Sequence, residues 1–207
     1  MSDEAPRAPE RWVREIVTVF VLSVTAVLTA WCGFESSKWG GEMSIAFSQA
    51  SSARIQAASY NGEARDARQF DLTIYANWVD ATANQNPQLA QYIQDRFTPT
   101  FAVAFRAWKA DGMKEPSPFA RDEYVPPGTV EAAEFNKTAD ARFADALKNN
   151  QRGDNYSLLT VLFALVLFLT AMSQRNIRGW VAWALLGLGI AAGLVAVVIM
   201  STFPIKI

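Results

Sequence analysis

The segment from Thr129 to Ser173 constrains the fold of this chain more than any other. Its first half, TVEAAEFNKTADARFADALKNNQRGDN, has the spacing of a water-soluble amphipathic helix, and its second half, YSLLTVLFALVLFLTAMS, carries no charge. A single helix of this length would measure about 65 Å, which is more than twice a bilayer core of about 30 Å. We therefore expect one helix to run from water into a membrane. Gly153 and Asp154 are the positions where such a helix could break.

Two further stretches are apolar enough to cross a membrane, so we expect three transmembrane helices, at residues 12–34, 156–173 and 179–203. The first follows a short polar tail, residues 1–11, which we expect to be disordered. Lipoprotein processing would need small residues just before the cysteine, but Trp31 directly precedes Cys32. An A-x-A-like cleavage site is also missing, since Leu28 lies two places before Ala30. This pattern favours an uncleaved signal anchor.

Short basic flanks predict the topology. The N-terminal flank carries three arginines, Arg7, Arg11 and Arg14, and the link at residues 174–178 carries two, whereas the tail at residues 204–207 has one lysine. By the positive-inside rule the N-terminus and the link are cytoplasmic. Residues 35–155 and the C-terminus are then extracytoplasmic.

The long insert between the first two spans is predicted to be entirely helical. We expect helices at about 42–84, 87–110 and 129–155 and one loop at 111–128, which is rich in proline and glycine. Pro99 should kink or split the second of these helices. The fold class is therefore an all-α membrane protein with three transmembrane helices and an extracytoplasmic antiparallel helical stalk or bundle continuous with spans 1 and 2.

Small residues mark the expected helix-packing surfaces. A 4-3 spacing of alanines predicts a helical seam in the insert, and glycines spaced by four predict a close crossing in the third span. A stalk only two helices thick could not cover its own apolar face, which favours a homo-oligomer joined through the alanine seam. The predicted packing residues are Ala46, Ala50, Ala53, Ala57, Gly189 and Gly193.

Asp71 occupies a seam position where an apolar residue would be expected. A buried carboxylate needs a partner, and Arg68, one turn earlier, is a candidate. The pair could form a polar seam that sets the register of the helices, or it could contact a ligand. The simplest alternative is a local rotation of the helix that places Phe70 inside and Asp71 in water.

Composition excludes several kinds of chemistry. The chain has no histidine, and Cys32 is its one cysteine, so histidine-dependent catalytic sites, CxxC pairs and iron–sulfur clusters are absent. Its 19 basic and 20 acidic residues leave no basic excess for nucleic acid. We expect no enzymatic activity, no cofactor and no metal site.

Two segments carry a resemblance to known sequences. At WCGFESSKWGGE, near the first span, and NNQRGDNYSLLTVLFALVLF, at the second, the chain resembles uncharacterised bacterial inner-membrane proteins with one N-terminal span, a helical insert and a closing two-span hairpin. The resemblance implies a multi-pass protein of the bacterial inner membrane. It implies no activity and no site residues.

The sequence leaves three functions open. The first is a non-enzymatic oligomeric membrane scaffold or accessory subunit that acts through its extracytoplasmic helical domain, with the lipid bilayer, further copies of itself and an unidentified membrane or extracytoplasmic protein as partners. The second is an extracytoplasmic sensor or small-molecule binder that needs a signalling partner. The third is a channel-like oligomer lined by hydroxyl side chains.

Overall fold

The computed structural model describes residues 9–175 and 177–206, all in helices, turns and loops without a strand among them. The expected disordered tail lies mostly outside the described residues, and the first helix begins at Pro9. The chain divides into two compact units. We call residues 1–47 with 144–207 the membrane unit, and residues 48–143 the insert unit.

Two long helices contribute to both units. Helix α1 runs over Pro9–Ala83 and α4 over Thr129–Ser173. The chain therefore stays helical through Gly40 and Gly41 in α1 and through Gly153 and Asp154 in α4. The predicted helix over 129–155 and the span after it are one element, and so are the first span and the predicted helix over 42–84.

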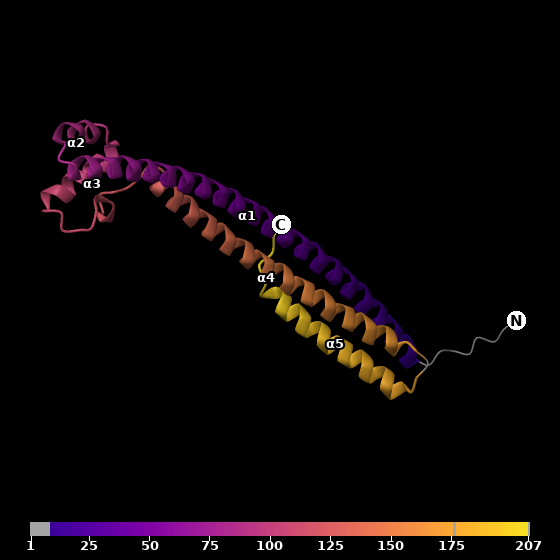
Figure 1. Ribbon diagram of the computed structural model, residues 1–207. Coiled ribbons are helices and arrows are strands. Elements are labelled where there is room, and N and C mark those ends of the chain that lie inside the picture. Colours follow the sequence, from indigo (N-terminus) through magenta and orange to yellow (C-terminus); the bar gives the residue numbers. More distant parts are fainter. Residues whose placement is uncertain (1–8, 176, 207) are drawn as a thin grey trace. The chain divides into compact units, whose positions relative to one another are not determined.

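Helices α1, α4 and α5 (Gly179–Ser201) are each long and apolar enough to cross a membrane. In the membrane unit α4 and α5 lie side by side, joined by a short link (Figure 1). Small residues permit this approach: a Cβ added at Gly189 would lie 3.0 Å from the Thr170 hydroxyl oxygen, and one at Gly193 would lie 3.6 Å from Val166. Both glycines that were predicted to pack therefore face α4.

In the insert unit the alanine seam is closed within one chain. Ala50, Ala53 and Ala57 of α1 are buried, and so are Ala132 and Ala139 of α4. Cross-contacts hold the two helices antiparallel: the rings of Tyr60 and Phe135 stack with centroids 5.5 Å apart, and Arg54 binds Asn136 and Asp140. Ala46, in the membrane unit, is buried as well. These alanines are thus occupied by packing within the chain.

The end of α1 in the insert unit carries a small lobe formed by α2 (Pro87–Gln94), α3 (Pro99–Ala110), the 3-10 turn η1 (Pro118–Ala120) and the loop around it. Figure 1 shows α2 and α3 against this end of α1. Pro99 splits the predicted helix over 87–110 in two, since proline begins α3 and the residues before it turn. Gln85, with φ of 56°, reverses the chain after α1.

Candidate functional site

A buried carboxylate ties the lobe to α1. The side chain of Asp71 is completely buried. The Thr98 hydroxyl donates to one of its oxygens at 2.7 Å, and the Tyr124 hydroxyl donates to the other at 2.9 Å. Thr98 begins α3 and Tyr124 lies in the loop before α4, so one carboxylate connects three segments that are distant in sequence. We call Asp71, Thr98 and Tyr124 the Asp71 cluster.

Local structure explains why Thr98 faces Asp71. Thr98 is the N-cap of α3, and its side-chain oxygen accepts the Phe101 backbone N–H at 3.3 Å. The same hydroxyl uses its proton for Asp71. A hydroxyl can donate one hydrogen bond and accept others at the same time. The Thr98 hydroxyl therefore caps α3 as an acceptor and binds the buried Asp71 carboxylate as a donor.

The structure places the predicted Asp71 and Arg68 close to each other but in different roles. Asp71 is bonded to the two hydroxyls, whereas the Arg68 guanidinium lies over the Tyr124 ring, 5.9 Å from its centroid. The alternative in which the helix rotates is wrong, because Phe70 is 56% exposed and Asp71 is inside. Sequence spacing could show Arg68, one turn away, but not Thr98 or Tyr124, which come from other segments.

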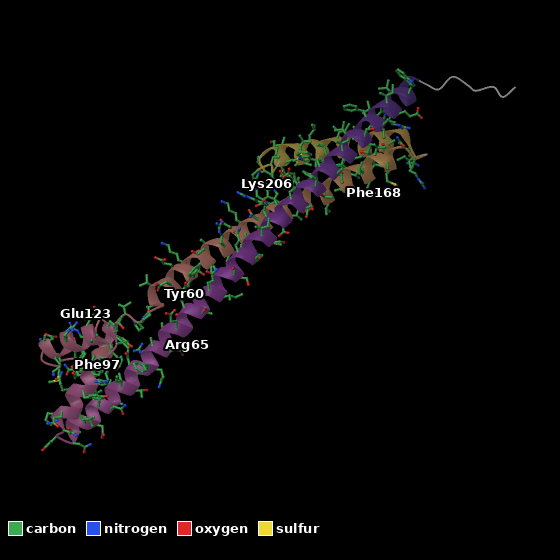
Figure 2. The ribbon with its side chains drawn as sticks, turned by 90° about the horizontal axis from the view of Figure 1, so that it is seen from above. Tyr60, Arg65, Phe97, Glu123, Phe168 and Lys206 are labelled. Carbon is green, nitrogen blue, oxygen red and sulfur yellow. The ribbon has the colours of Figure 1, made fainter. Side chains whose placement is uncertain are left out.

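An aromatic core surrounds the Asp71 cluster. Its buried rings come mainly from α3, and they pack edge-to-face and stacked against one another and against Tyr75 of α1. Figure 2 shows Phe97 inside this lobe. In such apolar surroundings a carboxylate without hydrogen bonds would cost several kcal/mol. The core members are Phe97, Phe101, Ala104, Phe105, Trp108 and Tyr124.

Tyr124 should make the stability of the insert unit sensitive to alkali. Burial raises the pKa of Tyr124 above its ordinary value, and the Asp71 carboxylate that accepts its proton raises it further. Because the pKa of Tyr124 is higher in the folded state than in the unfolded state, the neutral hydroxyl stabilises the fold. This stabilisation is complete below the ordinary tyrosine pKa of about 10 and is lost as the pH rises through the higher pKa of the folded state. We expect unfolding monitored by tryptophan fluorescence to show stability falling above about pH 10.

The variant Tyr124→Phe should lose much of that alkaline dependence, because it removes the titrating group. Tyr92→Phe is the matched control, since Tyr92 is 55% exposed on α2. Tyr75, whose pKa burial also raises, will keep part of the dependence in both variants. Equal alkaline profiles for wild type and Tyr124→Phe would contradict the assignment.

Charged residues organise the loop beside the Asp71 cluster. Arg121 pairs with Glu115 at 2.7 Å, with Glu123 at 3.0 Å and with Asp111 at 3.3 Å. Glu123 and Glu115 raise the pKa of Arg121, and Lys114 and Arg121 lower the pKa of Asp111. Three of the acidic residues of the loop, Asp111, Glu115 and Glu123, are therefore paired within it. Across the described residues no group of three or more His, Cys, Asp or Glu side chains could hold a metal ion.

A polar cleft of about 430 Å³ opens on the same lobe. Trp78 of α1 and Lys109 of α3 form part of its wall, and the Lys109 ammonium lies 5.9 Å from the centre of the Trp78 ring. Most of the other lining side chains carry amides. They are Gln85, Asn86, Gln91 and Gln94.

The membrane unit contains a second buried carboxylate, Glu35, which the sequence reading passed over. Glu35 is completely buried on α1. One of its oxygens accepts the backbone N–H of Lys206 at 2.9 Å, and the other is buried without a hydrogen-bond partner. A signal was present: Trp39 lies seven residues before Ala46, Glu35 lies four before Trp39 and Cys32 lies three before Glu35, which are helical spacings, and all three are buried.

The C-terminal residues close this site. The Tyr156 hydroxyl donates to the Pro204 carbonyl at 3.2 Å, and the Phe203 ring meets the Tyr156 ring edge-on. The Lys206 ammonium pairs with Glu42 at 3.3 Å. Thus the segment after α5 packs back onto α1 and α4 and covers Glu35.

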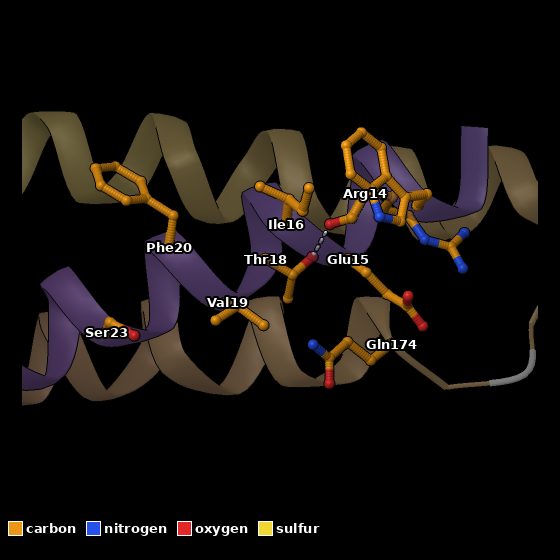
Figure 3. Close-up of a pocket in the computed structure, with 9 residues that line it drawn as sticks. Arg14, Glu15, Ile16, Thr18, Val19, Phe20, Ser23 and Gln174 are labelled. Atoms are coloured by element: carbon orange, nitrogen blue, oxygen red, sulfur yellow. Dashed lines mark hydrogen bonds between the residues drawn. The ribbon is translucent and has the colours of Figure 1, made fainter. Parts of the chain in front are cut away.

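A wide groove lies along the first turns of α1. Figure 3 shows Arg14, Thr18 and Gln174 on its walls, with the Thr18 hydroxyl turned back to the Arg14 carbonyl at 2.8 Å. Such hydroxyl-to-backbone bonds recur in the spans, at Thr160 and Ser173. These hydroxyls are satisfied within their own helices, whereas the Thr170 hydroxyl is buried without a hydrogen-bond partner.

Comparison with known proteins identifies no relative. No protein-family model matches the sequence, and searches of curated proteins and of solved structures found no significant similarity.

Proposed function

We propose that this protein is a non-enzymatic scaffold or accessory subunit of the bacterial inner membrane, which presents its insert unit to a protein partner outside the cytoplasm. The observation that carries the proposal is the surface of α2. None of its eight residues is buried, although the helix is amphipathic and ordered. Leu89 is 44% exposed, and Tyr92 is exposed beside it.

The chemistry of this surface suits protein recognition. The Arg96 guanidinium stacks on the Tyr92 ring at 3.4 Å from its centroid, which preorganises two residue types that dominate binding energy at interfaces. Beneath it the aromatic core and the Asp71 cluster hold the lobe rigid, so binding would cost little conformational entropy. We call Leu89, Tyr92 and Arg96 the α2 patch.

Self-association forms the second part of the proposal. The alanine seam is used within the chain, so a second copy would need another surface. On α1 in the membrane unit a Cβ added at Gly33, Gly40 or Gly41 would meet nothing within 4 Å. Each helical glycine costs about 1 kcal/mol relative to alanine, and close approach of another helix would compensate. Because Ser37 and Ser44 are also exposed on this part of α1, we assign the glycine surface to a second copy of the chain.

Site-specific photocrosslinking in native membranes tests both parts. A photoreactive residue at Tyr92 should give one discrete adduct with a different protein, and one at Ser44 should give an adduct of twice the mass of the chain. The substitution Leu89→Asp should abolish the first adduct and leave the second, since the two surfaces are separate.

A photoreactive residue at the exposed Asp66 serves as the matched control and should give neither adduct. If the photoreactive residue at Tyr92 gave adducts with other copies of this chain and none with a different protein, the scaffold function would be refuted. A heterologous adduct that persists in Leu89→Asp would refute the α2 patch. The absence of a dimer adduct from Ser44 would refute the glycine surface.

The second candidate function, a sensor or small-molecule binder, has one observation in its favour. The polar cleft combines the Trp78 ring, several amides and the Lys109 ammonium, which together could receive a hydroxylated, anionic small molecule. It ranks second because most of its lining polar groups are exposed to solvent. A ligand-dependent change in tryptophan fluorescence that Lys109→Ala removes would raise it above the scaffold.

A further inference from the structure

The groove along the first turns of α1 is polar at one end and apolar further along. Arg14, near the start of α1, and Gln174, directly after α4, line its polar end, and Val19 and Phe20 line it deeper along α1. Figure 3 shows these side chains around the groove. Its volume of about 760 Å³ lies within the range of sites for organic ligands, about 300 to 1,000 Å³. The groove therefore has the size and the polarity gradient that an amphipathic molecule requires.

When α1 crosses a membrane, this groove lies within one leaflet. Ser23, the last residue of α1 on its wall, follows Arg14 by nine residues, which is a rise of about 14 Å along a helix. Half of a bilayer core of about 30 Å is about 15 Å. Trp12 lines the same end of the groove as Arg14, and tryptophan is typical of the headgroup level. The groove thus runs from the headgroups to the middle of the bilayer.

The polar end of the groove suits an anion. The Arg14 guanidinium is a planar donor that matches phosphate oxygens, and no described residue forms an ion pair with it. Glu15, the acidic residue on the wall, already interacts with another residue of the chain. Arg175 and Arg178, both exposed on the link to α5, add positive charge at this end of the membrane unit (Figure 1). These charges favour an anionic headgroup over a zwitterionic one.

We infer that the groove binds one anionic phospholipid. Its phosphate pairs with the Arg14 guanidinium and accepts a hydrogen bond from the Gln174 amide, and one acyl chain lies along Val19 and Phe20. A helix from a second copy fits this groove less well, because the uncharged run of each span offers no carboxylate to Arg14. The inference requires only that α1 crosses a membrane, so it stands or falls separately from the α2 patch and the glycine surface.

The test is quenching of tryptophan fluorescence in the full-length protein, reconstituted in nanodiscs of mixed phosphatidylcholine and phosphatidylglycerol. One of the two lipids carries bromine on its acyl chains near the ester groups, and the total lipid composition stays constant. Trp12 reports on the groove, and its share of the quenching is the difference between each protein and the same protein with Trp12→Phe. We expect phosphatidylglycerol to associate with the groove about fivefold more strongly than phosphatidylcholine, and Arg14→Gln should reduce this preference to about one.

Two matched controls separate the groove from general attraction to the membrane surface. Arg175→Gln removes an equal charge at the same end without changing the groove wall, so it should lower the preference much less than Arg14→Gln. Val19→Phe narrows the groove and should lower the preference, whereas Val27→Phe, at an exposed position of α1 outside the groove, should not. Equal quenching by both lipids in the wild type, equal losses in Arg14→Gln and Arg175→Gln, or a preference that appears only after residues 2–8 are removed would overturn the proposal.

Discussion

Replacing Asp71 with alanine should lower the free energy of unfolding of the insert unit by about 3 to 5 kcal/mol. The substitution leaves the Tyr124 hydroxyl buried without its acceptor and removes the carboxylate that Thr98 binds. Each buried polar group left unpaired costs about 1 to 3 kcal/mol, and the lost side chain adds a cavity among packed rings. Hydrogen exchange of the α3 amides should therefore accelerate, and trypsin should cleave sooner at Lys109 and Arg121.

Two variants control for this prediction. Asp66→Ala removes an exposed carboxylate from the same helix, so its effect should stay within about 0.5 kcal/mol. Asp71→Asn preserves shape and one acceptor oxygen, so it should cost less than alanine. If Asp71→Ala and Asp66→Ala were equally stable, the Asp71 cluster would have no structural role.

The sequence predicts those parts of the fold that depend on short-range periodicity. The three spans follow from uncharged runs, the small residues Ala50 and Ala57 follow from 4-3 spacing, and the separation of α2 from α3 follows from the missing N–H and fixed φ of Pro99. Each of these signals lies within one segment. Continuity through Gly153 could not be read in this way, because a glycine costs only about 1 kcal/mol in a helix and packing decides the outcome. In the structure this glycine packs against α1, where an added Cβ would lie 3.4 Å from the Ser36 carbonyl oxygen, an ordinary contact distance.

Contacts between distant segments are what the sequence could not show. Asp71 stands out in its seam, but its hydroxyl partners come from a helix cap and a loop, and no spacing rule connects them. Glu35 shows the same limit. It lies on the buried face of α1, but the Lys206 N–H that donates to it comes from the C-terminal segment, and no spacing rule connects the two.

Gly128→Ala should destabilise the insert unit by about 3 kcal/mol or more, the second large effect expected in this chain. Gly128 has φ of +83°, which costs an L-residue about 1 to 2 kcal/mol. It also precedes α4, and its carbonyl accepts the Ala132 N–H at 2.9 Å, so it is the residue that begins the helix. An added Cβ would lie 2.5 Å from the Tyr60 carbonyl oxygen, a backbone atom that cannot rotate away.

Gly112→Ala separates the two causes. Gly112 has φ of +75°, but a Cβ there would meet nothing within 4 Å. Gly112→Ala should therefore lower the free energy of unfolding only by the cost of the left-handed backbone, about 1 to 2 kcal/mol. The difference between the variants, measured by urea unfolding of the insert unit in the intact protein, reports how closely α4 approaches α1 at Tyr60. Tyr60, whose carbonyl makes this contact, stacks on Phe135, so the near-ultraviolet circular dichroism of the pair should change in Gly128→Ala and not in Gly112→Ala. Equal losses of unfolding free energy in both variants would show that the close contact between Gly128 and the Tyr60 carbonyl does not affect stability. The packing of α4 against α1 would then not depend on this contact at this end of the alanine seam.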